Sequence, residues 1–421
     1  MTGFGYRGDA FSCEEVPIAR IASEVGTPCY VYSYQTLVDG YRALDEAFAG
    51  LPHLICYAMK ANSNLAILRI FLNEGGGLDI VTGGELYRAL RAGANPKKIV
   101  YAGVGKSSEE IEAALRAEIL LFNVESPQEL QAIQAVAGKL GVRAQVALRV
   151  NPDVDPHTHP YISTGLRQSK FGIPIQEARQ IYRSMGSLPN VEPVGVHAHI
   201  GSQITQVTPF QESIAKLLPL VRELRNDGCR IQYLDIGGGL GIRYKDEGPP
   251  APAEYAGTLA PLLASLDCTI LLEPGRLLVG NAGILVTKVL YDKANQAKKF
   301  LVVDGAMNDL IRPSLYSAYH TIVPVVRHSN GQPEVTLDVV GPICESGDFL
   351  AKERALPPCQ PGELLAVLSA GAYGFAMASN YNSRPRVPEV LVKGDQCFLI
   401  RARETYEDLV RGETIPAFCA S

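Results

Sequence analysis

The chain has 421 residues, of which 47% are hydrophobic and 20% are charged, with a formal net charge of −5. This is an ordinary globular composition, which excludes disordered, collagen-like and coiled-coil proteins. The charges are spread without runs of one sign, so we expect neither a nucleic acid nor a membrane as a partner. No apolar stretch reaches the length of about 18 residues that a membrane-spanning helix needs. The opening MTGFGYRGDAFSCEE lacks the apolar core of a secretory signal.

Nine cysteines are scattered along the chain without any C-x-x-C motif. This spacing is typical of reduced thiols in a cytoplasm, and it favours neither a disulfide framework nor a zinc site. We therefore expect a cytoplasmic protein without a structural metal.

The first predicted element is a short helix in the segment PIARIASEVG (17–26). Pro17 lies near its start and Gly26 past its end, the positions that these residue types favour. The pattern alone does not assign this N-terminal segment to a domain.

From about residue 50 to residue 280, short apolar runs alternate with helical stretches. The runs are rich in Ile, Val and Leu and lack polar alternation, as in parallel strands that are covered on both faces. There are eight of them: 54–60, 78–83, 98–103, 119–125, 144–151, 194–201, 233–239 and 269–275.

Helices are predicted between these runs, for example over 83–93, 126–140 and 210–228. The second has Ser126 as its N-cap with Glu129 at capping-box spacing, and the third ends on Gly228, a left-handed C-cap. Eight strands with intervening helices predict a (β/α)8 TIM barrel. A doubly wound open sheet is the alternative, because the number of strands does not prove that the sheet closes.

After about residue 280 the pattern changes to short apolar runs separated by Pro, Gly and Asn. These runs predict a second, all-β domain of the sandwich or barrel type. They span 284–292, 299–305, 321–326, 334–341, 363–370 and 386–404.

Polar residues gather where the predicted barrel strands end, and such strand ends meet at the mouth that holds the active site of a barrel. Lys60 ends the first run. Burial of an unpaired lysine disfavours its ammonium form, and a neutral amine is able to form a Schiff base with an aldehyde. The alternative is a solvated lysine just past the strand.

The glycine-rich loop GGGLG (237–241) follows the seventh run. A ligand can approach its backbone closely, and phosphate sites of barrels use the loops after strands seven and eight. A tight turn that needs a left-handed conformation is the alternative.

Two histidines, His197 and His199, lie two residues apart on the sixth run and are expected to face the same side of a strand. Such a pair is able to ligate zinc, but the sequence offers no obvious third and fourth ligand. The other interpretations are an aromatic wall for a planar ligand and satisfied core histidines.

Glu273 and Arg276 follow the eighth run. They form either a salt bridge with each other or a ligand site, in which the carboxylate keeps a heterocyclic nitrogen protonated and the guanidinium binds a carboxylate. An amine, a phosphate loop, a carboxylate and an imidazole together indicate pyridoxal phosphate (PLP). A class I aldolase would share the lysine and the phosphate loop, but it would need neither the glutamate nor the histidine.

The sequence resembles the diaminopimelate decarboxylases, which are PLP enzymes of fold type III, the group of alanine racemase and ornithine decarboxylase. The resemblance rests on eight motifs in order: GTPCYVYS (26–33), YAMKAN (57–62), HAHIGSQ (197–203), DIGGGLG (235–241), EPGR (273–276), RPSLY (312–316), GPICESGD (341–348) and GAYG (371–374). It implies a PLP-binding barrel over 31–278. It also implies a β domain made of 1–30 and 279–421 that completes the active site at a dimer interface.

The resemblance implies roles for individual residues. Lys60 is expected to bind PLP covalently, His199 to stack on the pyridine ring and Glu273 to pair with the ring nitrogen. The residues expected to hold the phosphate or another part of the cofactor are Ser202, Gly237, Gly238, Gly239, Gly275, Arg276 and Tyr373. The residues expected to bind substrate are Arg276, Arg312, Tyr316, Glu345 and Tyr373.

Cys344 is expected to act as a catalytic acid, and it reaches the site with Glu345 from the partner subunit of a homodimer. Without the resemblance, Arg312, Tyr316, Cys344 and Tyr373 would be interpreted as ordinary surface, buried or turn residues. Whether Cys344 or Lys60 returns a proton to the product stays open.

The implied activity is that of a carbon–carbon lyase, the PLP-dependent decarboxylation of meso-diaminopimelate to L-lysine and CO2 in lysine biosynthesis. Arg276 and Arg312 suit the distal carboxylate of this substrate and Glu345 its ammonium, whereas ornithine-type relatives typically carry Cys-Asp at Cys344-Glu345. The alternatives are a related decarboxylase of ornithine, arginine or lysine, a non-catalytic PLP-binding protein, and a racemase, whose relatives place an arginine at the ring nitrogen.

Overall fold

The computed structural model describes residues 3–156, 158–162, 164–165, 169–327 and 333–419. The chain forms two compact units. The barrel unit spans Thr36–Asn281, and the β unit combines Met1–Gln35 with Ala282–Ser421. Within the described residues, no helix is both long enough and apolar enough to cross a membrane.

Eight parallel strands of the barrel unit form a closed ring. Their order in the sheet is β9-β11-β12-β13-β5-β6-β7-β8, and β8 also pairs with β9, which closes the ring. The strands are β5 (His53–Ala58), β6 (Gly77–Ile80), β7 (Ile99–Tyr101), β8 (Leu121–Val124), β9 (Ala144–Asn151), β11 (Val191–His197), β12 (Tyr233–Asp235) and β13 (Thr269–Leu272). A short strand, β10 (Ile173–Pro174), pairs with β9. The predicted TIM barrel is confirmed, and the open-sheet alternative is wrong.

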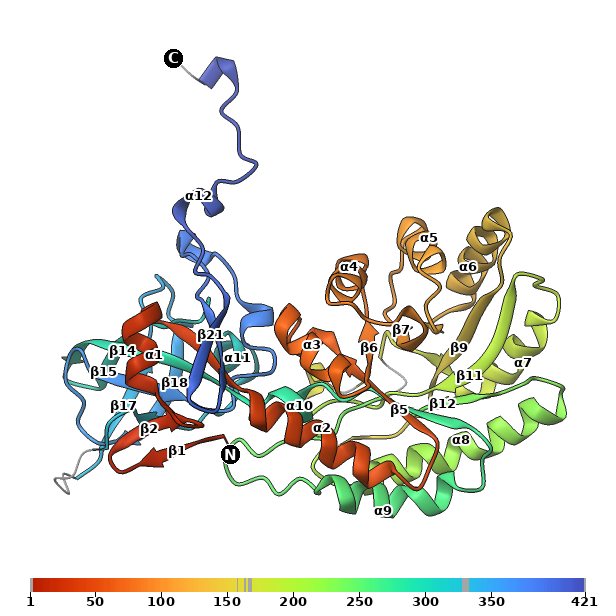
Figure 1. Ribbon diagram of the computed structural model, residues 1–421, viewed down its shortest axis with the longest axis horizontal. Helices are drawn as coiled ribbons and strands as arrows, with labels where there is room; N and C mark the ends of the chain where they lie inside the picture. The colour runs from red at the N-terminus through yellow and green to blue at the C-terminus, as the bar shows by residue number, and fades with distance from the viewer. Residues whose placement is uncertain (1–2, 157, 163, 166–168, 328–332, 420–421) are drawn as a thin grey trace. The chain divides into compact units, whose positions relative to one another are not determined.

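Helices cover the outside of this barrel (Figure 1). They are α3 (Leu65–Asn73), α4 (Gly83–Arg91), α5 (Ser108–Arg116), α6 (Pro127–Leu140), α7 (Ile175–Met185), α8 (Thr208–Asn226) and α9 (Pro252–Leu263). The unit also contains the short helix α10 (Arg276–Val279) and the 3-10 helices η1 (Met59–Ala61), η2 (Pro96–Lys98) and η3 (Pro160–Ile162). The boundary between the two units at residue 35 falls within α2 (Tyr34–Phe48).

The predicted helix ends agree with the structure except in one detail. The Ser126 hydroxyl accepts from the amide of Glu129 at 3.1 Å and caps α6, and Gly228 beyond α8 has φ +90°. The capping box does not form, because the Glu129 carboxylate accepts from the amide of Glu125 at 2.8 Å instead. It also binds the buried ammonium of Lys106 at 2.6 Å. A tertiary ion pair thus takes the side chain that local spacing assigns to the cap.

An apolar layer fills part of the barrel interior. Strands β5, β7, β8, β9, β11 and β13 each contribute to one cluster, which contains Cys56, Val100, Leu120, Leu121, Ala147, Val194 and Leu271. Burial of such surface is worth about 25 cal/mol per Å². This layer supplies the rigid support on which polar residues at the strand ends are held.

The β unit contains two sheets. Its strands are β1 (Phe4–Arg7), β2 (Ala10–Cys13), β3 (Val16–Pro17), β4 (Cys29–Ser33), β14 (Gly283–Ala294), β15 (Lys299–Val303), β16 (Ile322–Pro324), β17 (Val335–Val340), β18 (Phe349–Leu356), β19 (Leu364–Val367), β20 (Glu389–Lys393) and β21 (Gln396–Arg401). Strands β1-β2-β3 form the small sheet. The large sheet has the order β18-β17-β15-β14-β4-β20-β21, and β19 pairs with both β14 and β16.

The predicted β-rich second domain is confirmed, although some of its strands were not predicted. The N-terminal segment contributes β4, which pairs with β14 and β20, and the predicted helix α1 (Ile18–Val25). The run 386–404 is a hairpin of two strands. Strand β18 was missed because its sequence FLAKERAL carries three charged residues, two of them exposed and one half-buried. The unit also has the helices α11 (Arg312–Tyr316) and α12 (Tyr406–Leu409) and the 3-10 helices η4 (Phe375–Met377), η5 (Tyr381–Ser383) and η6 (Ala417–Cys419).

Candidate active site

Ionisable side chains converge at the C-terminal ends of five neighbouring barrel strands. Lys60 lies on η1 directly after β5, and Asp79 lies on β6. His197 and Asp235 are the last residues of β11 and β12, and Glu273 directly follows β13. Because β11-β12-β13-β5-β6 are adjacent in the sheet, these groups occupy one arc of the barrel mouth.

Lys60 has a carboxyl partner, as expected because burial of an unpaired ammonium costs free energy. Its ammonium donates to Oδ2 of Asp79 at 2.8 Å; the Asp79 side chain is fully buried and that of Lys60 is 37% exposed. Burial, with Glu273 nearby, raises the pKa of Asp79 to about 7, against the opposing effect of Lys60. The carboxyl group of Asp79 therefore titrates close to neutral pH.

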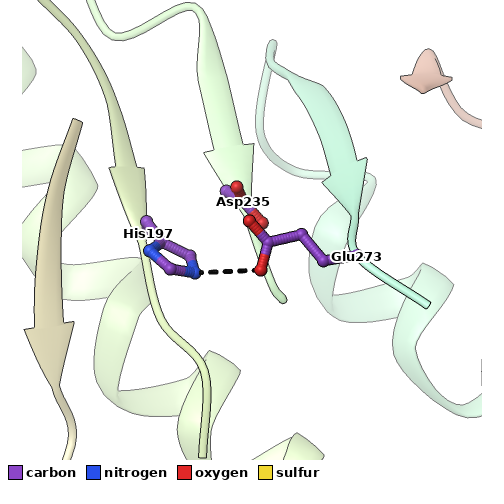
Figure 2. A group of neighbouring side chains, drawn as sticks. All are labelled: His197, Asp235 and Glu273. Carbon is purple, nitrogen blue, oxygen red and sulfur yellow. Dashed lines mark ion pairs between the residues drawn. The ribbon is translucent and has the colours of Figure 1, made fainter. Parts of the chain in front are cut away.

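Glu273 is a buried anion. Its Oε2 lies 3.4 Å from Nε2 of His197 (Figure 2), and its Oε1 accepts from the side-chain amide of Asn123 at 3.1 Å. Burial alone would raise the pKa of Glu273, but His197 and Lys60 outweigh burial and hold this pKa below its usual range.

Asp235 is the neutral neighbour of this anion. It is fully buried, and it accepts from the amide of Gly237 at 2.9 Å and from Asn123 at 3.1 Å. Burial and the adjacent Glu273 raise the pKa of Asp235 well above its usual value. Two carboxyl groups in contact inside a protein do not both ionise, and here the proton stays on Asp235.

His199 lies past the end of β11, which stops at His197, so the two histidines do not share one strand face as expected. The Nδ1 atom of His199 accepts from the amide of Gly238 at 3.2 Å. Burial, reinforced by Arg149 and Lys60, lowers the pKa of His199 well below its usual value. The imidazole is therefore neutral, with its proton assigned to Nε2.

The glycines after β12 are required by close backbone contact. A Cβ atom on Gly238 would collide with the carbonyl oxygen of Glu273, and one on Gly239 with the carbonyl oxygen of Gly201. Gly237 and Gly239 also have φ of +68° and +110°. The amides of Gly237 and Gly238 are already bonded to Asp235 and His199.

Arg276 begins α10 and is buried. Its guanidinium donates to the Tyr244 hydroxyl at 2.7 Å and to the Ser202 hydroxyl at 2.9 Å. The salt bridge with Glu273 that the spacing allowed does not form, because Glu273 faces His197 instead. Arg276 and Ser202, both predicted cofactor residues, are thus brought together.

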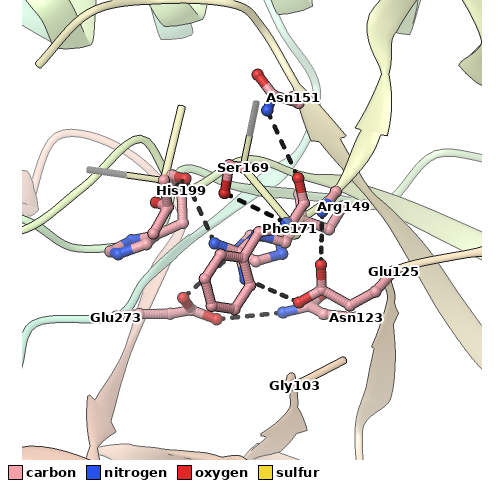
Figure 3. A network of polar contacts seen from close by, with 12 residues as sticks. Gly103, Asn123, Glu125, Arg149, Asn151, Ser169, Phe171, His199 and Glu273 are labelled. Atoms are coloured by element: carbon pink, nitrogen blue, oxygen red, sulfur yellow. Dashed lines mark hydrogen bonds and ion pairs between the residues drawn. The ribbon is translucent and has the colours of Figure 1, made fainter. Parts of the chain in front are cut away.

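A buried polar network extends from this mouth into the barrel wall (Figure 3). Arg149 on β9 binds the Glu125 carboxylate at 2.8 Å and lies 4.6 Å from the centre of the Phe171 ring. It also donates to the carbonyl oxygen of His199 at 3.5 Å. Asn123 joins the network to Glu273. The network holds the segment around His199 in place.

The remaining predicted site residues lie in the β unit. Arg312 begins α11 and donates to Nε2 of His320 at 2.8 Å, and Tyr316 ends the same helix. Tyr373 has a left-handed backbone with φ +55°. Cys344 is exposed, and its amide donates to Oδ1 of Asn382 at 2.9 Å.

Glu345 follows Cys344 and is also exposed. A hydrogen bond with its carboxylate raises the pKa of Tyr381. Asn382 and Tyr381 thus hold the segment Cys344–Glu345 through its backbone and its side chain.

Comparison with known proteins places the chain in a family. Residues 35–280 match the model of the family described as "Pyridoxal-dependent decarboxylase, pyridoxal binding domain". The diaminopimelate decarboxylase of Pseudomonas aeruginosa is 51% identical over 415 residues, which is 99% of each chain. That of Aquifex aeolicus is 52% identical over 96% of each chain. The chain belongs to the diaminopimelate decarboxylase family.

Solved structures of this family have the same fold. The diaminopimelate decarboxylase of Helicobacter pylori complexed with L-lysine is 43% identical, with a TM-score of 0.90 over 94% of this chain and 98% of that one. The enzyme of M. jannaschii in complex with L-lysine is 38% identical, with a TM-score of 0.94 over 99% of this chain and 98% of that one.

The barrel residues fit the cofactor of this family. An amine, an anionic carboxylate and a neutral imidazole gather at one arc of the mouth, which matches the aldehyde, the ring nitrogen and the ring face of PLP. Within the described residues, the backbone amides of Gly239 and Gly275 donate to no acceptor. Together with the hydroxyl of Ser202 and the guanidinium of Arg276, they form a donor set suited to a phosphate.

Sequence reasoning missed several residues of the site. Asn123, Arg149 and Asp235 lie inside predicted apolar runs, where we treated them as parts of strands. A single polar residue in a buried strand was the available signal, because burial without a partner is costly. Tyr244 lies in a loop without any such signal.

Proposed function

We propose that this chain catalyses the decarboxylation of meso-diaminopimelate to L-lysine and CO2 with PLP as its cofactor. The observation that carries the proposal is the buried anionic Glu273 next to the Lys60–Asp79 pair, in a chain that matches diaminopimelate decarboxylases over 99% of its length. PLP, when bound, supplies an aldehyde that takes up the amino group of the substrate and a protonated ring that accepts the electrons released as CO2 leaves.

The residues of the barrel unit would bind and orient this cofactor. Glu273 would hold a proton at the ring nitrogen, because its carboxylate stays ionised inside the barrel. His199 would lie on the ring face as a neutral group that adds no opposing charge. The amides of Gly239 and Gly275, with Ser202 and Arg276, would bind the phosphate.

Lys60 would act as the amine that holds the cofactor aldehyde and as a proton carrier at the α-carbon. Asp79 supports this role, because its carboxyl group accepts a hydrogen bond from the Lys60 amine at 2.8 Å and holds that amine at the mouth. Cys344 is the second candidate donor of the proton that replaces CO2 at the α-carbon.

The residues of the β unit would recognise the distal end of the substrate. Arg312, held by His320, suits a carboxylate, and Glu345 suits an ammonium group. Tyr316 and Tyr373 are further candidates for substrate contacts. We propose that Cys344 and Glu345 act on the site of a partner subunit in a homodimer. All nine cysteines are free thiols, which supports the cytoplasm as the compartment.

A turnover assay with separate stereoisomers tests the function. The purified protein, loaded with PLP, is incubated with meso-, LL- or DD-diaminopimelate or with L-ornithine, and the products are measured by mass spectrometry. We expect L-lysine and CO2 from the meso isomer alone. Turnover of ornithine would favour the related basic amino acid decarboxylase. A yellow protein without any turnover would favour a PLP-binding protein.

A further inference from the structure

The anion at the ring-nitrogen position, Glu273, has two buried neighbours to which the proposed chemistry gives no role. Asn123, on β8, donates through Nδ2 to Oε1 of Glu273 at 3.1 Å (Figure 3) and to Oδ2 of Asp235, also at 3.1 Å. Asp235, at the end of β12, faces the same carboxylate (Figure 2). Asn123 and Asp235 are fully buried, and Glu273 is 4% exposed.

The side-chain amide of Asn123 has only one workable orientation. Its NH2 group provides one hydrogen to each carboxyl group, and its Oδ1 has no hydrogen-bond partner among the described residues. The flipped orientation would place Oδ1 against oxygen atoms of two carboxyl groups, and both would lose a donor. Asn123 therefore acts as a clamp that fixes Glu273 and Asp235 relative to each other.

The two carboxyl groups have different surroundings. Glu273 faces His197 at 3.4 Å and receives a hydrogen bond from Asn123. Among the described residues, the Asp235 carboxyl group accepts from two donors, Asn123 and the amide of Gly237, and both are neutral. A second anion at Asp235 would compete with Glu273 for cations and would favour protonation of Glu273. The geometry thus assigns the negative charge to Glu273 and the proton to Asp235.

We propose that Asn123 and Asp235 are positioning residues for the ring-nitrogen contact: Asn123 clamps Glu273 in place, and Asp235 serves as its neutral hydrogen-bonding neighbour. This inference rests on the proposed function. It concerns the selectivity of the barrel for a protonatable ring nitrogen.

The test compares two cofactors on the same protein. One is PLP, and the other is its deaza analogue, which has C–H in place of the ring nitrogen. Each is titrated into the cofactor-stripped full-length protein, and the ratio of their dissociation constants is measured. General damage to the barrel changes both constants together, so the ratio reports on the ring-nitrogen contact alone.

We expect wild type to prefer PLP over the analogue. Asn123→Leu and Asp235→Leu should each reduce this preference about tenfold or more, because a hydrogen-bonded neighbour of an ionised group is lost. Asp235→Asn should lose less of this preference than Asp235→Leu, because the amide keeps a neutral donor for Glu273 and an acceptor for Gly237, although its NH2 group cannot accept from Asn123 as Oδ2 does. Tyr182→Phe is the matched control: Tyr182 is a buried barrel residue that bonds to Leu148 and Gly195, and its loss should leave the ratio unchanged.

An unchanged ratio in Asn123→Leu would overturn the clamp, whether or not Asp235→Leu folds. A loss in Asp235→Asn as large as that in Asp235→Leu would overturn the neutral role of Asp235. A wild-type protein without any preference for PLP would instead contradict the role of Glu273 itself, and with it the proposed function.

Discussion

Burial and pairing decide which ionisable groups at the barrel mouth carry charge. Asp79, Asp235 and Glu273 are three buried carboxyl groups within one arc, yet the pKa is raised for the first two and lowered for Glu273. The pKa of Glu273 is lowered because its interactions with His197 and Lys60 outweigh burial, whereas burial dominates for Asp79 and Asp235. Among these three carboxyl groups, Glu273 is thus the anion that we propose for the contact with the ring nitrogen.

Replacement of the lysine at the mouth tests its proposed role most directly. Lys60→Ala should abolish the visible absorbance of covalently held PLP and lower turnover by about 10³-fold or more, because the reacting amine is lost. Absorbance spectra and the lysine assay measure both effects. Lys97→Ala removes an exposed lysine paired with Glu118 and should change neither. Normal spectra and rates in Lys60→Ala would contradict the assignment.

The raised pKa of Asp79 predicts a pH dependence of stability. Between about pH 4, where the unfolded carboxyl group titrates, and pH 7, the folded state keeps a proton that the unfolded state has lost. The free energy of unfolding therefore falls through this group as the pH rises across that window. Asp79→Asn should reduce the loss of stability between pH 5 and pH 7.5, as measured by urea unfolding without cofactor.

The control for this experiment is Asp246→Asn, which replaces a carboxylate that is 85% exposed. It should follow wild type at both pH values. An equal pH dependence in Asp79→Asn and wild type would show that Asp79 is already ionised at pH 5.

The sequence pattern revealed those elements whose residues are buried along most of their length. The eight barrel strands were found because helices cover them and the sheet closes, so that nearly every position is apolar. The same uniformity hid Asn123 and Asp235. Asn123 bonds to Asp235, which is 112 residues further along the chain, and to Glu273, which is 150 residues further along, so no local pattern links them. Strand β18 carries exposed charged side chains in its middle, so it lacks the apolar run that marks the other strands. Lys60 and Glu273 were found because they stand at strand ends, where polar residues are visible.

The tight packing of the glycine loop predicts a strong effect of a single methyl group. Gly238→Ala should destabilise the protein by about 1–3 kcal/mol, because the added Cβ meets the backbone of Glu273, which cannot move without disturbing β13. Gly257→Ala is the matched control within α9, where a Cβ meets nothing and should stabilise the helix by about 0.5–1 kcal/mol. Thermal or urea unfolding measures both changes. Equal stability of the two variants would contradict the account of the loop.

At the scale of the whole molecule, the candidate site residues divide between two units. The barrel unit carries the residues proposed to hold the cofactor, around Lys60 and Glu273, and the β unit carries Arg312, Cys344 and Glu345. Exposure of Cys344, whose amide is nevertheless fixed by Asn382, suits a residue that meets another surface. The exposure of Cys344 is what a site shared between two copies of the chain would require.

Mixing two impaired variants tests that proposal. Cys344→Ala should slow turnover but still bind PLP, since the barrel residues are untouched, whereas Lys60→Ala fails to hold PLP covalently. If sites are shared, a heterodimer of the two has one site with both native residues. Random mixing of subunits should then restore about a quarter of wild-type activity. A chain that carries both substitutions, mixed with Lys60→Ala, should give no rescue. Activity of the mixture that equals only the sum of its parents would place Cys344 in the site of its own chain.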